Sequence, residues 1–199
     1  LQPSNALRES PIKAVVLTNA DVDHVAGLLN LRESQPLRLY GTGRVLSVLS
    51  ANSIFNVLNP DFVARLPLTL DQRCDLEQPD GTPLGISVIP FAVPGKVALW
   101  LEDKSQGDNF GTVEEDTIAL EVSDDSGARF YYMPACARMT DELAARVRGA
   151  ELIFFDGTLW VDDEMVRDGV GIKTGQRMGH MSVSGDDGTV AAFRDLEIK

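Results

Sequence analysis

One stretch of the sequence, residues 14–29, reads Ala14-Val15-Val16-Leu17-Thr18-Asn19-Ala20-Asp21-Val22-Asp23-His24-Val25-Ala26-Gly27-Leu28-Leu29. It begins with an unbroken apolar run rich in β-branched residues, which is typical of a buried strand. Behind a polar turn, Val25, Leu28 and Leu29 recur at helical spacing, so we expect a helix from about Asp23. A strand that leads into a helix in this way favours an α/β fold.

The polar turn places Asp21, Asp23 and His24 just beyond the predicted strand. Ligands of open α/β sheets bind outside the carboxyl ends of the strands. Carboxylates and neutral imidazoles are ordinary ligands of zinc and iron. We therefore predict a metal site at Asp21, Asp23 and His24. The alternative is that Asp21 or Asp23 caps the helix and that His24 lies on its surface.

The same stretch resembles the metal-binding motif of the metallo-β-lactamase superfamily, His-x-His-x-Asp-His. Asp23 and His24 stand at the last two motif positions, whereas Asn19 and Asp21 replace the first two histidines. One branch of the superfamily, which acts in the biosynthesis of pyrroloquinoline quinone (PQQ), lacks those two histidines. Residues 87–103, 154–165 and 169–181 also resemble that branch.

This resemblance implies an α/β fold, a single metallo-β-lactamase-like αββα sandwich over residues 1–199 that is incomplete at both ends. A preceding sheet half with a cysteine-rich zinc knot and a following strand with a histidine are expected to lie outside this sequence. Within it, we expect Val15–Leu17 and Leu152–Phe155 to form interior strands. Residues 1–11 have the composition of a loop or linker.

The resemblance also implies an iron-dependent oxygenase that hydroxylates the tyrosine ring of a cross-linked Glu–Tyr precursor. A single Fe²⁺ would be held by one carboxylate and two histidines. This sequence supplies the carboxylate of Asp23 and one histidine, His24. Zinc is the alternative metal. A carrier that helps move PQQ or its precursor toward the periplasm is the alternative. A two-zinc hydrolase is disfavoured because Asn19, Asp21 and Ala135 replace residues that such a centre uses.

Three basic residues are candidates for binding the anionic precursor. Lys173 and Arg177 lie in the glycine-rich segment 169–179, and they would clamp carboxylates of the substrate. Lys96 follows Val93-Pro94-Gly95, where other superfamily members often carry a histidine, and it would face an anionic ligand. The alternative for Lys96 is an ordinary solvated lysine.

Two residues are candidates for catalysis. Asp156 ends the apolar run Leu152–Phe155 and is expected at the same sheet edge as Asp23, where it would be a ligand or would orient His24 or bound water; otherwise it is a turn aspartate. His180 resembles a histidine that acts beside the metals in related phosphodiesterases, the alternative being a structural histidine. We also expect the carboxylates of Asp21, Asp23 and Asp156 to converge.

Local patterns predict several further elements. Strands are expected at 37–40, 66–70, 84–91 and 117–122, with a hairpin turn at 124–127 and a returning strand at 129–133. Residues 41–43 indicate a turn and residues 44–51 a helix. The helix signals are clearest at 140–149, where Thr140 can cap the start and Gly149 can end the helix.

Composition limits the partners. The 199 residues carry a net charge of −12 and no basic cluster, which disfavours nucleic acid and anionic membranes. No apolar run approaches the ~18 residues of a spanning helix, and no signal peptide opens the sequence, so we expect no membrane insertion. The distant Cys74 and Cys136 fit a reducing cytoplasm, although one disulfide is left open, as is a homodimer.

Overall fold

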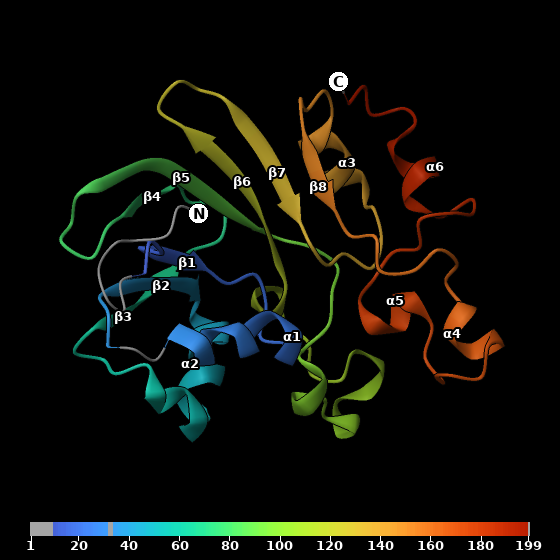
Figure 1. The fold of residues 1–199 in the computed structure, drawn as a ribbon. Helices are drawn as coiled ribbons and strands as arrows, with labels where there is room; N and C mark the ends of the chain where they lie inside the picture. The colour runs from blue at the N-terminus through green and yellow to red at the C-terminus, as the bar shows by residue number, and fades with distance from the viewer. Residues whose placement is uncertain (1–9, 32–33, 199) are drawn as a thin grey trace.

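The computed structural model describes residues 10–31 and 34–198 (Figure 1). The strands are β1 (Ala14–Val16), β2 (Leu37–Thr42), β3 (Val63–Leu68), β4 (Cys74–Glu77), β5 (Pro83–Ala92), β6 (Ile118–Asp124), β7 (Arg129–Met133) and β8 (Ile153–Phe155). The α-helices are α1 (Val22–Val25), α2 (Gly43–Ala51), α3 (Asp141–Val147), α4 (Glu164–Arg167), α5 (Gly175–Met178) and α6 (Thr189–Phe193). Short 3₁₀ helices are η1 (Ala26–Leu31), η2 (Ser53–Val57), η3 (Leu99–Leu101), η4 (Lys104–Asn109) and η5 (Glu114–Asp116).

The strands form two sheets. The first has the order β1-β2-β3, with both pairs parallel. The second has the order β4-β5-β6-β7-β8, in which the first three pairs are antiparallel and β7 and β8 are parallel. An isolated bridge between Asn19 and Thr117 joins the segment after β1 to the segment before β6.

Three clusters of buried side chains define the layers. One packs the first sheet against α2 and η1, through residues such as Leu39 and Leu49. A second lies between the two sheets and includes Tyr40 and Leu120. The third packs the outer face of the second sheet against α3 and the C-terminal segment. Figure 1 shows α1 and α2 below the first sheet and the second sheet above it. The predicted αββα order is therefore confirmed.

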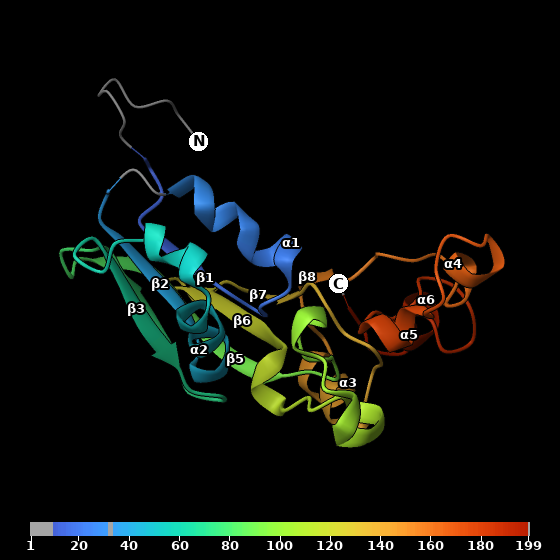
Figure 2. The same ribbon diagram turned by 90° about the horizontal axis from the view of Figure 1, so that it is seen from below.

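The C-terminal third of the chain adds a side wall to the sandwich. In Figures 1 and 2, α4 and α5 lie beside the sheets at one end of the molecule rather than in a layer. The segment that follows α5 returns to the end of β8, where His180 contacts Asp156. This wall places Lys173 and the end of α5 near the β1–α1 turn.

Most of the predicted local elements are confirmed. The helix at α3 begins as expected, because the Thr140 side chain accepts a hydrogen bond from the Leu143 backbone N–H, and Gly149 has a φ of +69° just beyond its end. The β6–β7 hairpin and the helix α2 also lie where they were predicted.

Other local predictions were wrong. The expected turn at 41–43 does not form, since Gly41 and Thr42 continue β2 and Gly43 begins α2, where Thr42 is the cap. Within the described residues β1 and β8 are edge strands rather than interior ones, because each pairs on one side only. The half-buried pattern of β1 fits that position. Most of the predicted loop at 1–11 lies outside the described residues.

Two further findings concern the cysteines and the absence of a membrane-spanning helix among the described residues. Both cysteines are free, with Cys136 buried and Cys74 half-buried. Among the residues that the structure describes, no helix has the length and apolar character needed to cross a bilayer.

Candidate functional site

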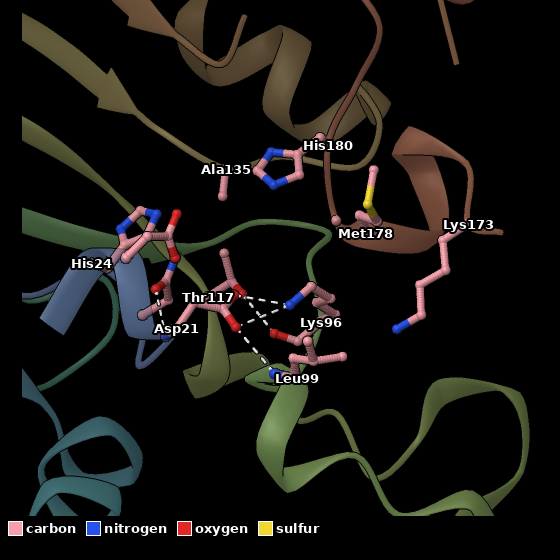
Figure 3. A pocket seen from close by; sticks show the side chains of 12 residues that line it. Asp21, His24, Lys96, Leu99, Thr117, Ala135, Lys173, Met178 and His180 are labelled. Atoms are coloured by element: carbon pink, nitrogen blue, oxygen red, sulfur yellow. Dashed lines mark hydrogen bonds and ion pairs between the residues drawn. The ribbon is translucent and has the colours of Figure 1, made fainter. Parts of the chain in front are cut away.

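A pocket of about 330 Å³ lies beyond the carboxyl end of β1 (Figure 3). It is bounded by the β1–α1 turn, by the segments that follow β5 and β7, and by the end of α5. This volume suits a small organic molecule, since ligand pockets begin at ~300 Å³. Its lining residues are Asn19, Asp21, Asp23, His24, Lys96, Leu99, Thr117, Ala135, Lys173, Met178, Gly179 and His180.

Asp21 occupies the N-cap position of α1, but its side chain does not cap the helix. Its two carboxylate oxygens instead accept hydrogen bonds from Lys96 Nζ at 2.9 and 3.1 Å, and Oδ1 also accepts one from the Leu99 backbone N–H at 3.0 Å. The Asp21 N–H in turn donates to Asn19 Oδ1 at 3.0 Å. Asp21 therefore ties the β1–α1 turn to the segment that follows β5.

Asp23 and His24 lie in the single turn of α1 and line the same pocket. Asp23 is exposed and His24 is half-buried. Among the described residues neither side chain has a hydrogen-bond or ion-pair partner. A free carboxylate and a free imidazole that face one pocket are therefore both available to a ligand.

His180 faces the pocket from the other side and is held from behind by Asp156. His180 Nδ1 lies 2.6 Å from Asp156 Oδ2 and 3.3 Å from the Thr158 hydroxyl. Thr158 also donates its hydroxyl and its backbone N–H to Asp156 Oδ1, at 2.8 and 3.1 Å. Burial disfavours the charged form of Asp156, but the hydrogen bonds from His180 and Thr158 outweigh it and lower the pKa of its carboxyl.

An ionised Asp156 fixes the tautomer of His180. The carboxylate can only accept, so His180 Nδ1 carries the proton and donates it to Asp156. The other ring nitrogen, Nε2, is then a free acceptor when the imidazole is neutral. In Figure 3 the ring of His180 lies beside Ala135, with the ring of His24 on the far side of Ala135.

Of the two partners expected for Asp156, His24 or bound water, His24 was wrong, because the Asp156 carboxylate contacts His180 instead. The prediction that Asp21, Asp23 and Asp156 converge was wrong for Asp156, because Asp21 and Asp23 line the same pocket and Asp156 does not. Asp21 is paired with Lys96, and Asp156 lies behind the imidazole of His180. The turn-aspartate alternative for Asp156 holds as well, since one of its oxygens accepts the Thr158 backbone N–H.

Glu102 gathers the two basic residues of the glycine-rich segment. Its carboxylate oxygens accept from Lys173 Nζ at 3.2 and 3.5 Å and from the Arg177 guanidinium at 3.3 and 3.0 Å. The guanidinium also lies 3.8 Å from the ring centre of Phe110, a cation–π distance. Burial raises the pKa of Glu102, but the hydrogen bonds and charges of Arg177 and Lys173 outweigh it and lower the pKa. The cluster carries one net positive charge.

The described residues supply only part of a metal shell. No three His, Cys, Asp or Glu side chains in residues 10–31 and 34–198 lie close enough together to hold a metal. Asp23 and His24 have the donor chemistry that iron and zinc accept, and both face the pocket without partners. They therefore fit a metal as two of its ligands.

The predicted site residues thus fall into three groups. Asp21, Asp23, His24, Lys96, Lys173 and His180 meet in one pocket. Asp156 lies behind that pocket in contact with His180, and Arg177 does not line it but shares the carboxylate of Glu102 with Lys173, which does. The metal, substrate and catalytic roles assigned to these residues stay predictions, because the geometry places side chains and not ligands.

Sequence reasoning missed Glu102 and Thr158. Thr158 follows Asp156 by two residues, and that spacing is the signal of a turn in which an aspartate accepts from the following backbone. Glu102 has no such local signal, because its partners lie 71 and 75 residues away along the chain.

Comparison with known proteins bears on the whole chain. The family model described as the β-lactamase superfamily domain matches residues 1–199. Coenzyme PQQ synthesis protein B of Gluconacetobacter diazotrophicus is 56% identical over 201 residues, which cover 100% of this chain and 64% of that protein. The protein of the same name from Xanthomonas oryzae is 52% identical, covering 100% of this chain and 63% of that protein.

A solved structure also matches this chain over nearly its whole length. The crystal structure of Zn²⁺-bound PqqB from Methylobacterium extorquens matches with a TM-score of 0.88 and 47% sequence identity. The match covers 99% of this chain and 63% of that one. The chain therefore spans a little under two thirds of the length of the relatives that it matches.

Proposed function

Because the chain belongs to the β-lactamase superfamily and matches coenzyme PQQ synthesis protein B along its whole length, we propose that it forms part of an enzyme of PQQ biosynthesis. The proposed reaction is the iron-dependent hydroxylation of the tyrosine ring in a cross-linked Glu–Tyr precursor. One observation carries this proposal: His180, held by Asp156, faces the same pocket as the unpartnered Asp23 and His24.

Asp23 and His24 are the residues of this chain that would hold the metal. They offer one carboxylate and one imidazole, the two kinds of ligand found in non-haem iron oxygenases, which leave coordination positions open. Iron bound there would supply the activation of dioxygen. Zinc is the metal found with the relative from Methylobacterium extorquens, so zinc competes for the same ligands in this proposal.

His180 would move a proton at Nε2. Its Nδ1 is committed to Asp156, so only Nε2 can act on a molecule in the pocket. The phenol of the tyrosine ring is a group from which a base in this position can take a proton before the ring reacts. A positioned acid or base of this kind contributes ~10²–10⁴-fold to a rate.

The substrate's carboxylates would meet the cluster of Glu102, Lys173 and Arg177. The cluster has one more positive than negative charge, and Lys173 is the member that lines the pocket. Its net charge matches one carboxylate of the precursor, which Lys173 would meet in the pocket while the Arg177 guanidinium stays bound to Glu102.

A carrier for PQQ or its precursor is the second candidate. It is favoured by the small number of metal ligands among the described residues, since binding needs the pocket and the basic cluster but no metal. A carrier and an enzyme differ in whether bound precursor is changed.

Turnover by the full-length protein separates the two. The protein would be stripped of metal, reloaded anaerobically with Fe²⁺ or with Zn²⁺, and mixed with the Glu–Tyr precursor, dioxygen and a reductant. We expect a product heavier by one oxygen atom from the iron form alone. Tight binding of precursor or quinone by all three forms, with no product from any, would support the carrier and contradict the enzyme.

A further inference from the structure

Asp21 and Lys96 form an ion pair in the pocket that Asp23 and His24 also line, and Figure 3 shows the pair with its hydrogen bonds. The side chain of Lys96 is 16% exposed and that of Asp21 is 23% exposed. Ion pairs of fully exposed residues are weak because solvent screens them, but this pair is largely shielded. Three donated hydrogen bonds occupy the carboxylate, two from Lys96 Nζ and one from the Leu99 N–H.

The surrounding backbone holds Lys96 in this position. The Thr117 hydroxyl donates to the Lys96 carbonyl at 3.0 Å. Gly95 allows Thr117 to approach, since an added Cβ at Gly95 would lie 2.5 Å from Thr117 Cβ and Oγ1. Gly179, with a φ of +89°, packs beside the lysine stem, where an added Cβ would lie 3.2 Å from Lys96 Cγ. The backbone of Lys96 is thus held by the Thr117 hydroxyl and its neighbour Gly95, and its side-chain stem packs against Gly179.

The carboxylates of Asp21 and Asp23 line the pocket. The ion pair with Lys96 occupies the oxygens of Asp21, so that they are not available to a metal. A metal could draw on both Asp21 and Asp23 if both were free, because carboxylates bind zinc and iron readily. The oxygens of Asp21 already accept from an ammonium, and that ammonium repels a dication that approaches the same oxygens. Asp23 is the pocket carboxylate that keeps its oxygens free.

We propose that Lys96 acts as an internal cation that keeps Asp21 from ligating the metal and so limits the described part of the site to Asp23 and His24. This inference rests on the proposed metal site. It gives Lys96 and Asp21 one joint role, in place of the separate roles of substrate anchor and metal ligand that the sequence indicated. Lys96 is in this account a positioning residue that selects which carboxylate binds the metal.

The test is the affinity of the full-length protein for Zn²⁺, measured by competition with a chelator of known affinity. Lys96→Met removes the charge and keeps most of the side-chain length. We expect Lys96→Met to bind Zn²⁺ at least about tenfold more tightly than the wild type, a change of about 1.4 kcal/mol. Lys96→Arg keeps the cation and should bind as the wild type does. The double variant Lys96→Met/Asp21→Asn should lose the gain.

Removing one member of a shielded ion pair is destabilising, so a second uncharged variant is included in case Lys96→Met does not fold. Lys96→Gln keeps a hydrogen-bond donor for Asp21 without the charge, and it should show the same gain. If the uncharged variants bind Zn²⁺ no more tightly than the wild type, the inference is overturned. A gain that persists in the double variant also overturns it, because Asp21 would not be its source. A wild type that binds no metal contradicts the proposed function separately, whatever the variants do.

Discussion

His180 Nδ1 lies 2.6 Å from Asp156 Oδ2, and the Asp156 side chain is only 1% exposed. The carboxylate of Asp156 therefore accepts hydrogen bonds from the His180 imidazole and from Thr158 and makes little contact with solvent. This arrangement leaves His180 Nε2 as the reactive position and makes Asp156 the residue that orients it.

Replacing Asp156 tests that relationship. Asp156→Asn keeps the shape of the side chain but removes the charge that fixes the tautomer of His180. We expect turnover of the full-length, iron-loaded protein to fall by ~10²–10⁴-fold, with iron content unchanged. Thr158→Val, which removes one hydroxyl donor and leaves the Asp156–His180 contact, is the matched control and should fall far less. Turnover of Asp156→Asn within about twofold of the wild type would contradict the assigned role.

Replacing His24 tests the metal site. His24→Ala should lower iron affinity by more than the ~10–100-fold typical of residues that only support a ligand, because a ligand itself is lost. His180→Ala is the comparison, and it should keep the metal while losing turnover on the order of 10²–10⁴-fold. Iron stoichiometry and rate, measured on both variants, check this. Full iron and wild-type turnover in His24→Ala would remove the assignment.

The Glu102 cluster predicts a dependence of stability on acid pH. The pKa of Glu102 is lower in the folded chain than its ordinary value of 4.5. The cluster's contribution to the free energy of unfolding is therefore fully present above about pH 4.5 and is lost as the pH falls through the lower, folded pKa. Urea unfolding from pH 3 to 7 should show a shallower acid loss for Glu102→Gln, which should also be less stable at pH 7. An unchanged pH dependence would contradict the cluster's ionised state.

The close approach of Gly95 to Thr117 predicts a difference between two glycines. Gly95→Ala should destabilise the fold by ~1–3 kcal/mol, because the added methyl overlaps the Thr117 side chain. Gly27→Ala is the matched control, since nothing lies within 4 Å of its added Cβ and it should stay within ~0.5 kcal/mol. Thermal or urea unfolding measures both. Equal stabilities for the two variants would show that the segment carrying Lys96 is not held as described.

The local elements were predictable because their signals are short-range. Thr140 and Gly149 bound α3, and the apolar run at β1 and the turn at 124–127 need only neighbouring residues. The strand β4 was missed, because Cys74–Glu77 is only four residues long and contains two acidic residues, which are uncommon in strands, and it forms by pairing with β5. The interior position expected for β1 and β8 failed because apolar composition does not say how many neighbours a strand has.

The members of the site were largely predictable, but their pairings were not. Asp21, Asp23, His24 and His180 were each singled out, and they share one pocket. The partners of Asp21 and Asp156 depend on contacts across 75 and 24 residues of chain, which local spacing does not encode. The sequence therefore grouped three carboxylates, whereas the fold pairs Asp21 with Lys96, joins Asp156 to the His180 imidazole and leaves Asp23 without a partner among the described residues.

Labelled dioxygen offers the most direct test of the proposed hydroxylation. The full-length, iron-loaded protein would be given the Glu–Tyr precursor, a reductant and dioxygen enriched in heavy oxygen, and the product would be analysed by mass spectrometry. The account predicts one heavy oxygen atom on the tyrosine ring, and its loss in His24→Ala. A product whose added oxygen comes from water, or precursor recovered unchanged from a protein that holds its iron, would contradict it.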